Sequence, residues 1–190
     1  MGDAQYCLCC GENVPTNMVY RDGNTEITCL YCGFVLGLKE KEGGAMADCI
    51  LTADDSSTIR NLMTQILKEK GLAREVLSFE NGMVFLTEFN KRISSEKGVN
   101  LVILDLQMPV LDGLKAAMTL RAIEKKKTGP SSKKVPIIFF SARKCDEFLK
   151  KQLSQCTPAV YFNKGETPDP TAIADRINHL VSYILSKQRE

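Results

Sequence analysis

The sequence predicts an α/β protein built on a five-stranded, doubly wound parallel sheet, with a small cysteine-rich β module before it. From residue 48 onward, five short apolar stretches alternate with five amphipathic stretches of helical period. Such alternation is typical of a parallel sheet with helices on both faces. Before residue 48 the chain is rich in turn residues, and five of its eight cysteines fall within the first 32 residues. These two patterns indicate two different structural units.

Composition limits the classes of protein that the chain can represent. The 190 residues are 44% hydrophobic, which is enough for an ordinary core. A net charge of +2 gives no reason to expect a nucleic acid or an anionic membrane as partner. No apolar run approaches the roughly 20 residues that span a bilayer. The N-terminus lacks the basic and apolar parts of a signal peptide. We therefore expect a cytoplasmic protein with no membrane segment.

The expected domain boundaries follow changes in composition. The cysteine module covers residues 1–36, a polar, glycine-containing linker covers 37–47, and the α/β domain covers 48–190.

The expected strands are apolar and each ends where polar residues begin. They cover residues 49–53, 75–79, 101–106, 136–142 and 159–163. The helices are expected at 57–70, 82–97, 112–126, 144–155 and 170–188. Ile59, Leu62 and Ile66 follow the spacing of one buried helical face. The last helix begins with Asp169 before Pro170, an arrangement that favours a helix start.

Four of the expected strands end in residues of complementary chemistry. Asp54 and Asp55 follow the first strand, and Asp105 ends the third. Ser141 ends the fourth strand, and Lys164 follows the fifth. The carboxyl ends of parallel strands share one edge of the sheet, where ligands bind. Neighbouring carboxylates repel each other without a cation, and oxygen ligands suit Mg²⁺ or Mn²⁺.

A metal-loaded carboxylate, a hydroxyl and a lysine are the groups that phosphoryl transfer to an aspartate needs. Taken singly, each residue is more often a helix cap, a turn residue or a solvated charge. The coincidence of four such strand ends favours a functional site over these structural readings.

Four segments carry a resemblance to a known family: ILTADDS (50–56), VILDLQMPVLDGL (102–114), IIFFSA (137–142) and VYFNKG (160–165). From about residue 48 to 188 the chain resembles the CheY-like receiver domain of bacterial two-component response regulators. The resemblance implies a flavodoxin-like fold with strand order 2-1-3-4-5. It also implies a signalling protein that accepts a phosphoryl group from a sensor histidine kinase or a histidine phosphotransfer protein. Output would be contact with a downstream protein, which the sequence does not identify, or the chain would be a phosphate relay. The chain would not be an enzyme, apart from Mg²⁺-dependent self-catalysed phosphorylation and dephosphorylation.

The resemblance also assigns roles to the residues of the pocket. Asp105 matches the phosphoacceptor, and Asp54 and Asp55 match the acidic pair that binds Mg²⁺ with it. Asp55 is favoured over Asp54 as the direct ligand. The backbone carbonyl of Gln107 would complete the metal site.

Three further positions match residues that bind the phosphoryl group or respond to it. Ser141 matches the hydroxyl that hydrogen-bonds the group, and Lys164 matches the lysine of the family. Tyr161 matches the aromatic switch residue, which is expected to turn inward when Ser141 moves.

Two features depart from the family pattern. Gly165 follows Lys164, where the family usually has proline, so the backbone geometry of that loop is left open. The stretch 124–136 is longer than usual and holds five lysines. A solvated loop is favoured there over a docking patch for an acidic partner.

The cysteine module contains two C-x-x-C-G elements, with eighteen residues between Cys10 and Cys29. We predict a structural zinc ion on Cys7, Cys10, Cys29 and Cys32, as in zinc ribbons. A hairpin with RDGN at its turn is expected between the two elements. About 36 residues build too little core to fold alone, so Zn²⁺ would supply folding energy. A redox dithiol, a rubredoxin-like iron site and accidental cysteines remain alternatives.

The sequence predicts less about the roles of the other cysteines. Cys9 is spare, and it could replace Cys10 with poorer geometry. Cys49, Cys145 and Cys156 are expected to be structural thiols, buried in the α/β domain.

Charge bears on the role of the cysteine module. Residues 1–46 contain three basic and six acidic side chains, which argues against phosphate binding. Binding of a protein partner is therefore favoured, and a homodimer is left open. The alternative is a transcription regulator that binds nucleic acid through the ribbon. A phosphatase of the haloacid dehalogenase type is disfavoured, because it needs a second acid where Gln107 stands.

Overall fold

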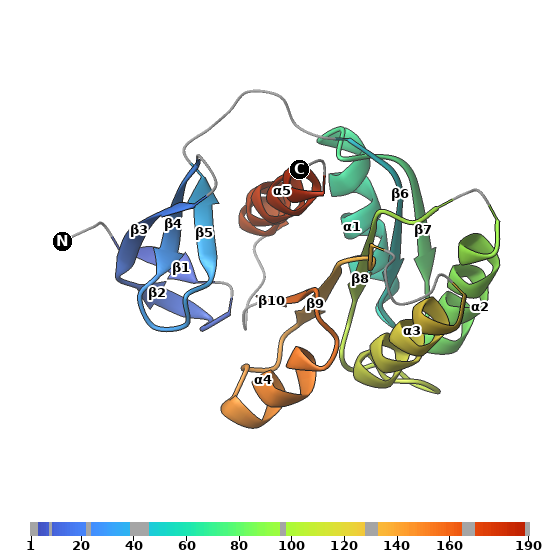
Figure 1. Cartoon of the computed structure of the whole chain (residues 1–190). Helices are drawn as coiled ribbons and strands as arrows, with labels where there is room; N and C mark the ends of the chain where they lie inside the picture. Colours follow the sequence, from blue (N-terminus) through green and yellow to red (C-terminus); the bar gives the residue numbers. More distant parts are fainter. Residues whose placement is uncertain are drawn as a thin grey trace.

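The structure, a computed structural model, describes residues 4–7, 9–21, 24–38, 46–95, 98–127, 133–164 and 170–188. It contains a five-stranded sheet flanked by helices and, beside it, a smaller group of short strands formed by the N-terminal residues (Figure 1). Among the described residues no helix is both long enough and apolar enough to cross a bilayer.

The five-stranded sheet is parallel throughout. Its strands are β6 (Ala47–Ala53), β7 (Ala73–Phe79), β8 (Leu101–Leu104), β9 (Ile137–Ser141) and β10 (Ala159–Asn163). Their spatial order is β10-β9-β8-β6-β7, which confirms the expected order 2-1-3-4-5. Strand β8 lies at the centre, so all four of its residues, Leu-Val-Ile-Leu, are buried. A strand covered on both faces requires such a continuous apolar run.

Five helices cover the two faces of this sheet. They are α1 (Ser57–Glu69), α2 (Gly82–Ile93), α3 (Gly113–Lys127), α4 (Glu147–Ser154) and α5 (Pro170–Lys187). Helices α1 and α5 bury their apolar stripes on one face, and α2, α3 and α4 bury theirs on the other. Ser56, Asn81 and Asp146 cap the starts of α1, α2 and α4 by accepting hydrogen bonds from backbone N–H groups.

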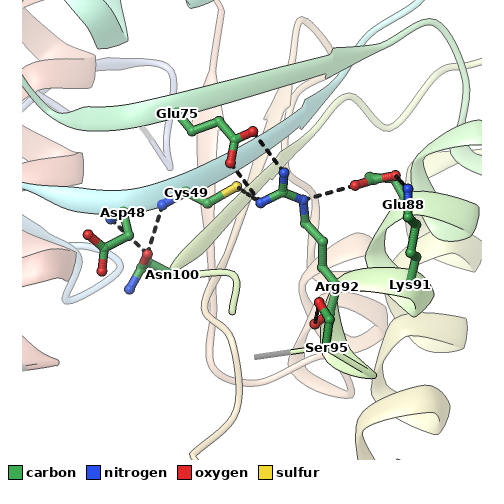
Figure 2. Close-up of polar contacts among 8 residues, drawn as sticks. All are labelled: Asp48, Cys49, Glu75, Glu88, Lys91, Arg92, Ser95 and Asn100. Carbon is green, nitrogen blue, oxygen red and sulfur yellow. Dashed lines mark hydrogen bonds and ion pairs between the residues drawn. The ribbon is translucent and has the colours of Figure 1, made fainter. Parts of the chain in front are cut away.

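A buried arginine ties α2 to the amino-terminal half of the sheet (Figure 2). The Arg92 guanidinium donates through Nη2 to Glu75 Oε1 at 2.8 Å and through Nε to Glu88 Oε1 at 3.0 Å. Its Nη1 lies 3.1 Å from the sulfur of Cys49. Arg92 is buried, and such a charge needs this full set of partners. The cluster lies at the strand ends opposite to the acidic residues, and we assign it a structural role.

The N-terminal residues form two small antiparallel sheets. Strand β1 (Gln5–Cys7) pairs with β2 (Glu12–Val14), and β3 (Thr16–Arg21) pairs with β4 (Asn24–Cys29), which pairs with β5 (Val35–Leu38). The pairing of β3 with β4 is the hairpin expected from the sequence, although its turn residues lie outside the described part. Strand β5 runs to Leu38 and β6 begins at Ala47, so both strands extend slightly into the expected linker, of which residues 39–45 lie outside the described part.

Candidate functional site

The carboxyl edge of the parallel sheet gathers the acidic residues that follow β6 and β8. Carboxylate oxygens of Asp54, Asp55 and Asp105 lie within 4.8 Å of one another. Asp54 and Asp105 are buried, whereas Asp55 is exposed. The structure therefore brings together the three carboxylates predicted to share a site, with one of them on the solvent side.

Lys164, at the end of β10, lies between the two buried carboxylates. Its ammonium nitrogen donates to Asp54 Oδ2 at 2.7 Å and lies 3.3 Å from Asp105 Oδ1. The backbone N–H of Lys164 donates to the Ser141 carbonyl at 2.8 Å, which fixes the lysine to the end of β9. The Lys164 ammonium thus pairs with two buried carboxylates at once, and Asp55 adds a third acidic group beside them.

The electrostatics of the pocket act most strongly on Asp105. Burial raises the pKa of the Asp105 carboxyl from 3.8 to about 6, and the Lys164 ammonium opposes this rise. The carboxylates of Asp54 and Asp55 raise the same pKa further. Ionised Asp105 is therefore short of positive charge, and a divalent cation would supply it. An all-oxygen set with one exposed member fits Mg²⁺ or Mn²⁺, which keep several waters.

Backbone contacts hold the acidic loop after β6 in place. Asp54 Oδ1 accepts a hydrogen bond from the Ser56 N–H at 2.9 Å. The guanidinium of Arg60 in α1 donates to the carbonyls of Asp54 at 2.8 Å and Asp55 at 3.0 Å. Sequence reasoning missed Arg60, because a single basic residue on a helix has no distinguishing pattern.

Glycine is required where the chain turns after Asp105. A Cβ atom on Gly113 would lie 1.9 Å from the Asp105 carbonyl oxygen, so no other residue fits without movement of the backbone. Val110 in the same turn has a φ of 67°, an uncommon conformation for a β-branched residue. This turn, "MPVLDG" in the sequence, places the start of α3 directly against the end of β8.

Ser141 and Tyr161 meet on the side of the pocket near α4. Ser141 is fully buried, and its Oγ accepts a hydrogen bond from the Arg143 N–H at 3.3 Å. The Tyr161 hydroxyl donates to the Arg143 carbonyl, and burial raises the pKa of Tyr161 to about 12. The Tyr161 ring therefore lies inward in this structure, with 4% of its surface exposed. From the sequence, this inward position is expected only as the outcome of phosphorylation.

The structure shows less about the remaining positions predicted from the sequence. Gln107 lies two residues beyond Asp105 with its side chain exposed, and the role of its carbonyl stays a prediction. Gly165 lies outside the described residues, as do residues 128–132 of the lysine-rich stretch.

The four cysteines of the two C-x-x-C-G elements converge into one cluster. The sulfur atoms of Cys7, Cys10, Cys29 and Cys32 lie within 4.8 Å of one another. Cys7 and Cys32 are 3.5 Å apart and Cys10 and Cys29 are 3.8 Å apart, measured between sulfurs. A tetrahedral zinc site with bonds of about 2.3 Å places its sulfurs about 3.8 Å apart. The cluster therefore fits Zn²⁺, and Cys9 is not part of it.

Each C-x-x-C-G element has the turn that such a ligand pair needs. The N–H of Cys10 points at the Cys7 sulfur and that of Cys32 at the Cys29 sulfur, both at 3.4 Å. Gly11 and Gly33 have φ angles of 75° and 71°, which favour glycine. N–H donation to sulfur stabilises thiolates, the form that binds a metal.

The fold and the carboxylate–lysine pocket at its edge define a receiver-type α/β protein. Residues 50–170, well over half of the chain, match the response regulator receiver domain family. The chain belongs to the response regulator receiver domain family. Domains of this family accept a phosphoryl group rather than act as catalysts, use Mg²⁺ at an acidic pocket, and interact with histidine kinases and phosphotransfer proteins.

Curated relatives match part of the chain. A protein-glutamate methylesterase/protein-glutamine glutaminase of Paramagnetospirillum magneticum is 35% identical over 75 residues, which are 40% of this chain and 18% of the relative. The chemotaxis protein CheV1 of Helicobacter pylori is 28% identical over 115 residues, which are 54% of this chain and 33% of the relative. The chain thus spans a third or less of the length of these relatives.

Solved structures show the same fold. The receiver domain of the histidine kinase CKI1 from Arabidopsis thaliana, in complex with Mg²⁺ and BeF₃⁻, superposes with a TM-score of 0.61 at 21% identity. The match covers 77% of this chain and 93% of that one. The response regulator domain of Thermotoga maritima CheB has a TM-score of 0.56 at 16% identity, covering 74% of this chain and 97% of that one.

Proposed function

We propose that Asp105 accepts a phosphoryl group from a sensor histidine kinase or a histidine phosphotransfer protein, and that the chain signals through contact with a downstream protein. The observation that carries this proposal is the position of Lys164, 3.3 Å from Asp105 and 2.7 Å from Asp54. There the buried Asp105 carboxylate, at the end of the central strand, lies beside a lysine and two further acidic residues. This is the arrangement that phosphoryl transfer to an aspartate requires.

The transfer exchanges one bond to phosphorus for another. A carboxylate oxygen of Asp105 attacks the phosphorus of a phosphohistidine, so a P–O bond forms as the P–N bond breaks, and the imidazole leaves with the bonding electrons. Asp54, Asp55, Asp105 and the Gln107 carbonyl would hold Mg²⁺ or Mn²⁺. The bound cation supplies charge neutralisation for the phosphoryl oxygens. The Lys164 ammonium binds a second of these oxygens, and the Ser141 hydroxyl donates to the third.

Asp105 must be ionised to act as the nucleophile. Its pKa of about 6 leaves it mostly ionised near neutral pH, and a bound cation lowers that pKa. The buried position excludes most water, so the charges of Lys164 and the cation act at close range.

We assign the four-cysteine cluster a structural Zn²⁺ ion that stabilises the fold of the cysteine module. The support is the tetrahedral spacing of the four sulfurs and the N–H groups directed at Cys7 and Cys29. Among the residues of the module that the structure describes, the buried core consists of Cys7, Val14 and Cys29, which is too small to fold on its own. The module serves contact with protein rather than with nucleic acid.

The test of the proposed function is phosphoryl transfer to the purified full chain. Incubation with acetyl phosphate and Mg²⁺, followed by intact-mass spectrometry, is expected to give one phosphoryl group per chain. Asp105→Asn is the matched control, since it keeps the shape of the side chain and removes the nucleophile. Equal labelling of the wild type and the variant would rule out Asp105 as the acceptor. Metal analysis of the same preparation is expected to find one zinc ion per chain.

A further inference from the structure

The cysteine module packs against the receiver domain through an arginine that contacts two aromatic rings. The guanidinium carbon of Arg176, in α5, lies 4.4 Å from the centre of the Tyr6 ring of β1. It also lies 4.7 Å from the centre of the Phe162 ring of β10. The Nη2 group donates to the Asn163 carbonyl at 2.7 Å, so the guanidinium is also fixed to the end of β10. One side chain therefore joins the two units.

A second contact lies further along α5. The Tyr183 hydroxyl donates to Glu26 Oε1, in β4, at 3.2 Å. Glu26 is only 2% exposed, so α5 covers this carboxyl group. Tyr6 and Phe34 pack against the apolar cluster that includes the core residues of α1 and α5. Figure 1 shows α5 on the side of the receiver that faces the module. The interface thus combines apolar packing with polar contacts.

The third contact involves the first C-x-x-C-G element and the edge of the phosphorylation pocket. A Cβ atom on Gly11 would lie 3.1 Å from Nδ2 of Asn163, the residue immediately before Lys164. The thiol groups of Cys9 and Cys145 lie close enough for each to shift the pKa of the other, although they belong to different units. Cys145 lies four residues after Ser141, in the loop before α4. The first C-x-x-C-G element therefore lies against the end of β10 and against the loop between β9 and α4.

Hydrogen bonds of Arg143 connect this loop to Ser141, at the edge of the pocket. The Arg143 carbonyl accepts hydrogen bonds from the Tyr161 hydroxyl and from Asn163 Nδ2, the latter at 3.3 Å. The Arg143 N–H donates to Ser141 Oγ at 3.3 Å. A movement of Ser141 must therefore displace Arg143, and with it the contacts of Asn163 and Cys145 to the module.

We propose that the cysteine module is an intramolecular docking partner of the receiver domain and that phosphorylation of Asp105 weakens this docking. The second part rests on the proposed function. A phosphoryl group on Asp105 draws the Ser141 hydroxyl toward its oxygens, and the loop that carries Arg143 and Cys145 follows. The Cys9–Cys145 and Gly11–Asn163 contacts are lost, while the Tyr6–Arg176 contact is left to hold the module more weakly.

Phosphorylation of Asp105 and docking of the cysteine module affect each other reciprocally. If a phosphoryl group weakens docking by some factor, loss of docking must strengthen the binding of a phosphoryl mimic by the same factor. Couplings of this kind typically amount to about 5- to 150-fold. Variants that remove the interface are therefore expected to bind BeF₃⁻ and Mg²⁺ more tightly than the wild type.

Docking is tested by linking Cys9 to Cys145 in the zinc-loaded full chain. Oxidised glutathione accepts two electrons from the two thiols, so a Cys9–Cys145 disulfide forms and two molecules of reduced glutathione are released. Mass spectrometry of digested protein quantifies the linked peptide. We expect rapid linking, which Cys145→Ser abolishes and Cys156→Ser leaves unchanged, since Cys156 is buried in the receiver. Absence of the linked peptide from the wild type would overturn the docking.

Coupling is tested by adding BeF₃⁻ with Mg²⁺. The linking rate is expected to fall at least about 5-fold in the wild type and to stay constant in Asp105→Asn. An unchanged rate in a chain that accepts phosphoryl from acetyl phosphate would overturn the coupling. A chain that accepts no phosphoryl group would instead contradict the proposed function, and the linking rate without BeF₃⁻ would still report the docking.

Interface variants give the reciprocal measurement. Tyr6→Ala and Arg176→Ala are expected to raise the affinity for BeF₃⁻ with Mg²⁺ at least about 5-fold, as measured by calorimetric titration. Tyr31→Ala, at an exposed aromatic residue of the same module, and Arg74→Ala, at an exposed arginine of the receiver, are the matched controls. Equal affinities for all four variants would overturn the coupling.

Discussion

The ammonium nitrogen of Lys164 lies 3.3 Å from Asp105 Oδ1, and about nine-tenths of each side chain is buried. The two residues are 59 positions apart in the sequence and meet because β8 and β10 end at the same edge of the sheet. The same ammonium also binds Asp54 at 2.7 Å, so it partly neutralises two buried carboxylates. This contact explains why two acids can be buried side by side.

Removal of the lysine charge is expected to slow phosphorylation. In Lys164→Met the side chain keeps much of its length, but one positive group is lost from the phosphoryl oxygens. The loss of one such positioned group typically costs about 10²–10³ in rate. Initial rates of labelling by acetyl phosphate measure the effect. Lys91→Met, at an exposed lysine of α2, is the matched control and is expected to keep the wild-type rate.

Acidity is expected to weaken Mg²⁺ binding through Asp105. Because the metal requires the ionised carboxylate, protons compete with it below the Asp105 pKa of about 6. The affinity for Mg²⁺ should be nearly constant from pH 7 to 8 and fall by up to about tenfold per pH unit below 6. Calorimetric titrations across this range measure it. An affinity that stays flat down to pH 5 would contradict the raised pKa.

The same pKa predicts the stability of Asp105→Asn in Mg²⁺-free buffer. A folded-state pKa raised above 3.8 means that ionisation of Asp105 is more costly in the folded chain than in the unfolded one. The wild type therefore loses stability as pH rises from about 4 through about 6, by up to about 3 kcal/mol for a shift of about two units. Asp105→Asn avoids this loss. Urea unfolding should show the variant to be more stable at pH 7 and similar at pH 3.5.

Gly113 is expected to tolerate no side chain. In Gly113→Ala the new methyl group would overlap the Asp105 carbonyl oxygen, so the turn must shift, at a cost of about 1–3 kcal/mol or more. Both the free energy of unfolding and the rate of phosphorylation should fall, because the shifted group belongs to Asp105, the proposed acceptor residue. Gly98→Ala, at a position with open space around it, is expected to change neither. Wild-type behaviour of both variants would contradict the close approach.

The two neighbouring cysteines of the first C-x-x-C-G element are expected to differ in their effect on zinc. Cys10→Ser removes one of the four clustered sulfurs, so zinc content should fall well below one per chain and the module should lose its fold. Cys9→Ser lies outside the cluster and should keep the metal. Metal analysis measures the first effect, and backbone NMR spectra report the fold of each unit. Equal zinc loss in the two variants would argue against the assigned ligand set.

The sequence predicted most of the sheet and its acidic edge because both have local patterns. Buried parallel strands need apolar runs, and the residues after them fall at one edge whatever the helices contain, so Asp54, Asp105 and Lys164 could be placed together. The alternation of strands with amphipathic helices likewise predicted the doubly wound sheet.

Contacts between distant surfaces have no such local pattern. Arg60 and Arg176 look like ordinary basic residues on amphipathic helices. Only the packing shows that Arg60 holds the acidic loop and that Arg176 contacts the rings of Tyr6 and Phe162. Tyr161 of β10 likewise donates to the Arg143 carbonyl, which belongs to the loop after β9.

The central claim is that Asp105 carries the phosphoryl group, and peptide mapping of the labelled chain tests it most directly. After incubation with acetyl phosphate and Mg²⁺, the account predicts phosphate on the peptide that contains Asp105, and none after omission of the metal or in Asp105→Asn. Phosphate on a different residue in the wild type, or undiminished labelling of Asp105→Asn, would contradict the account.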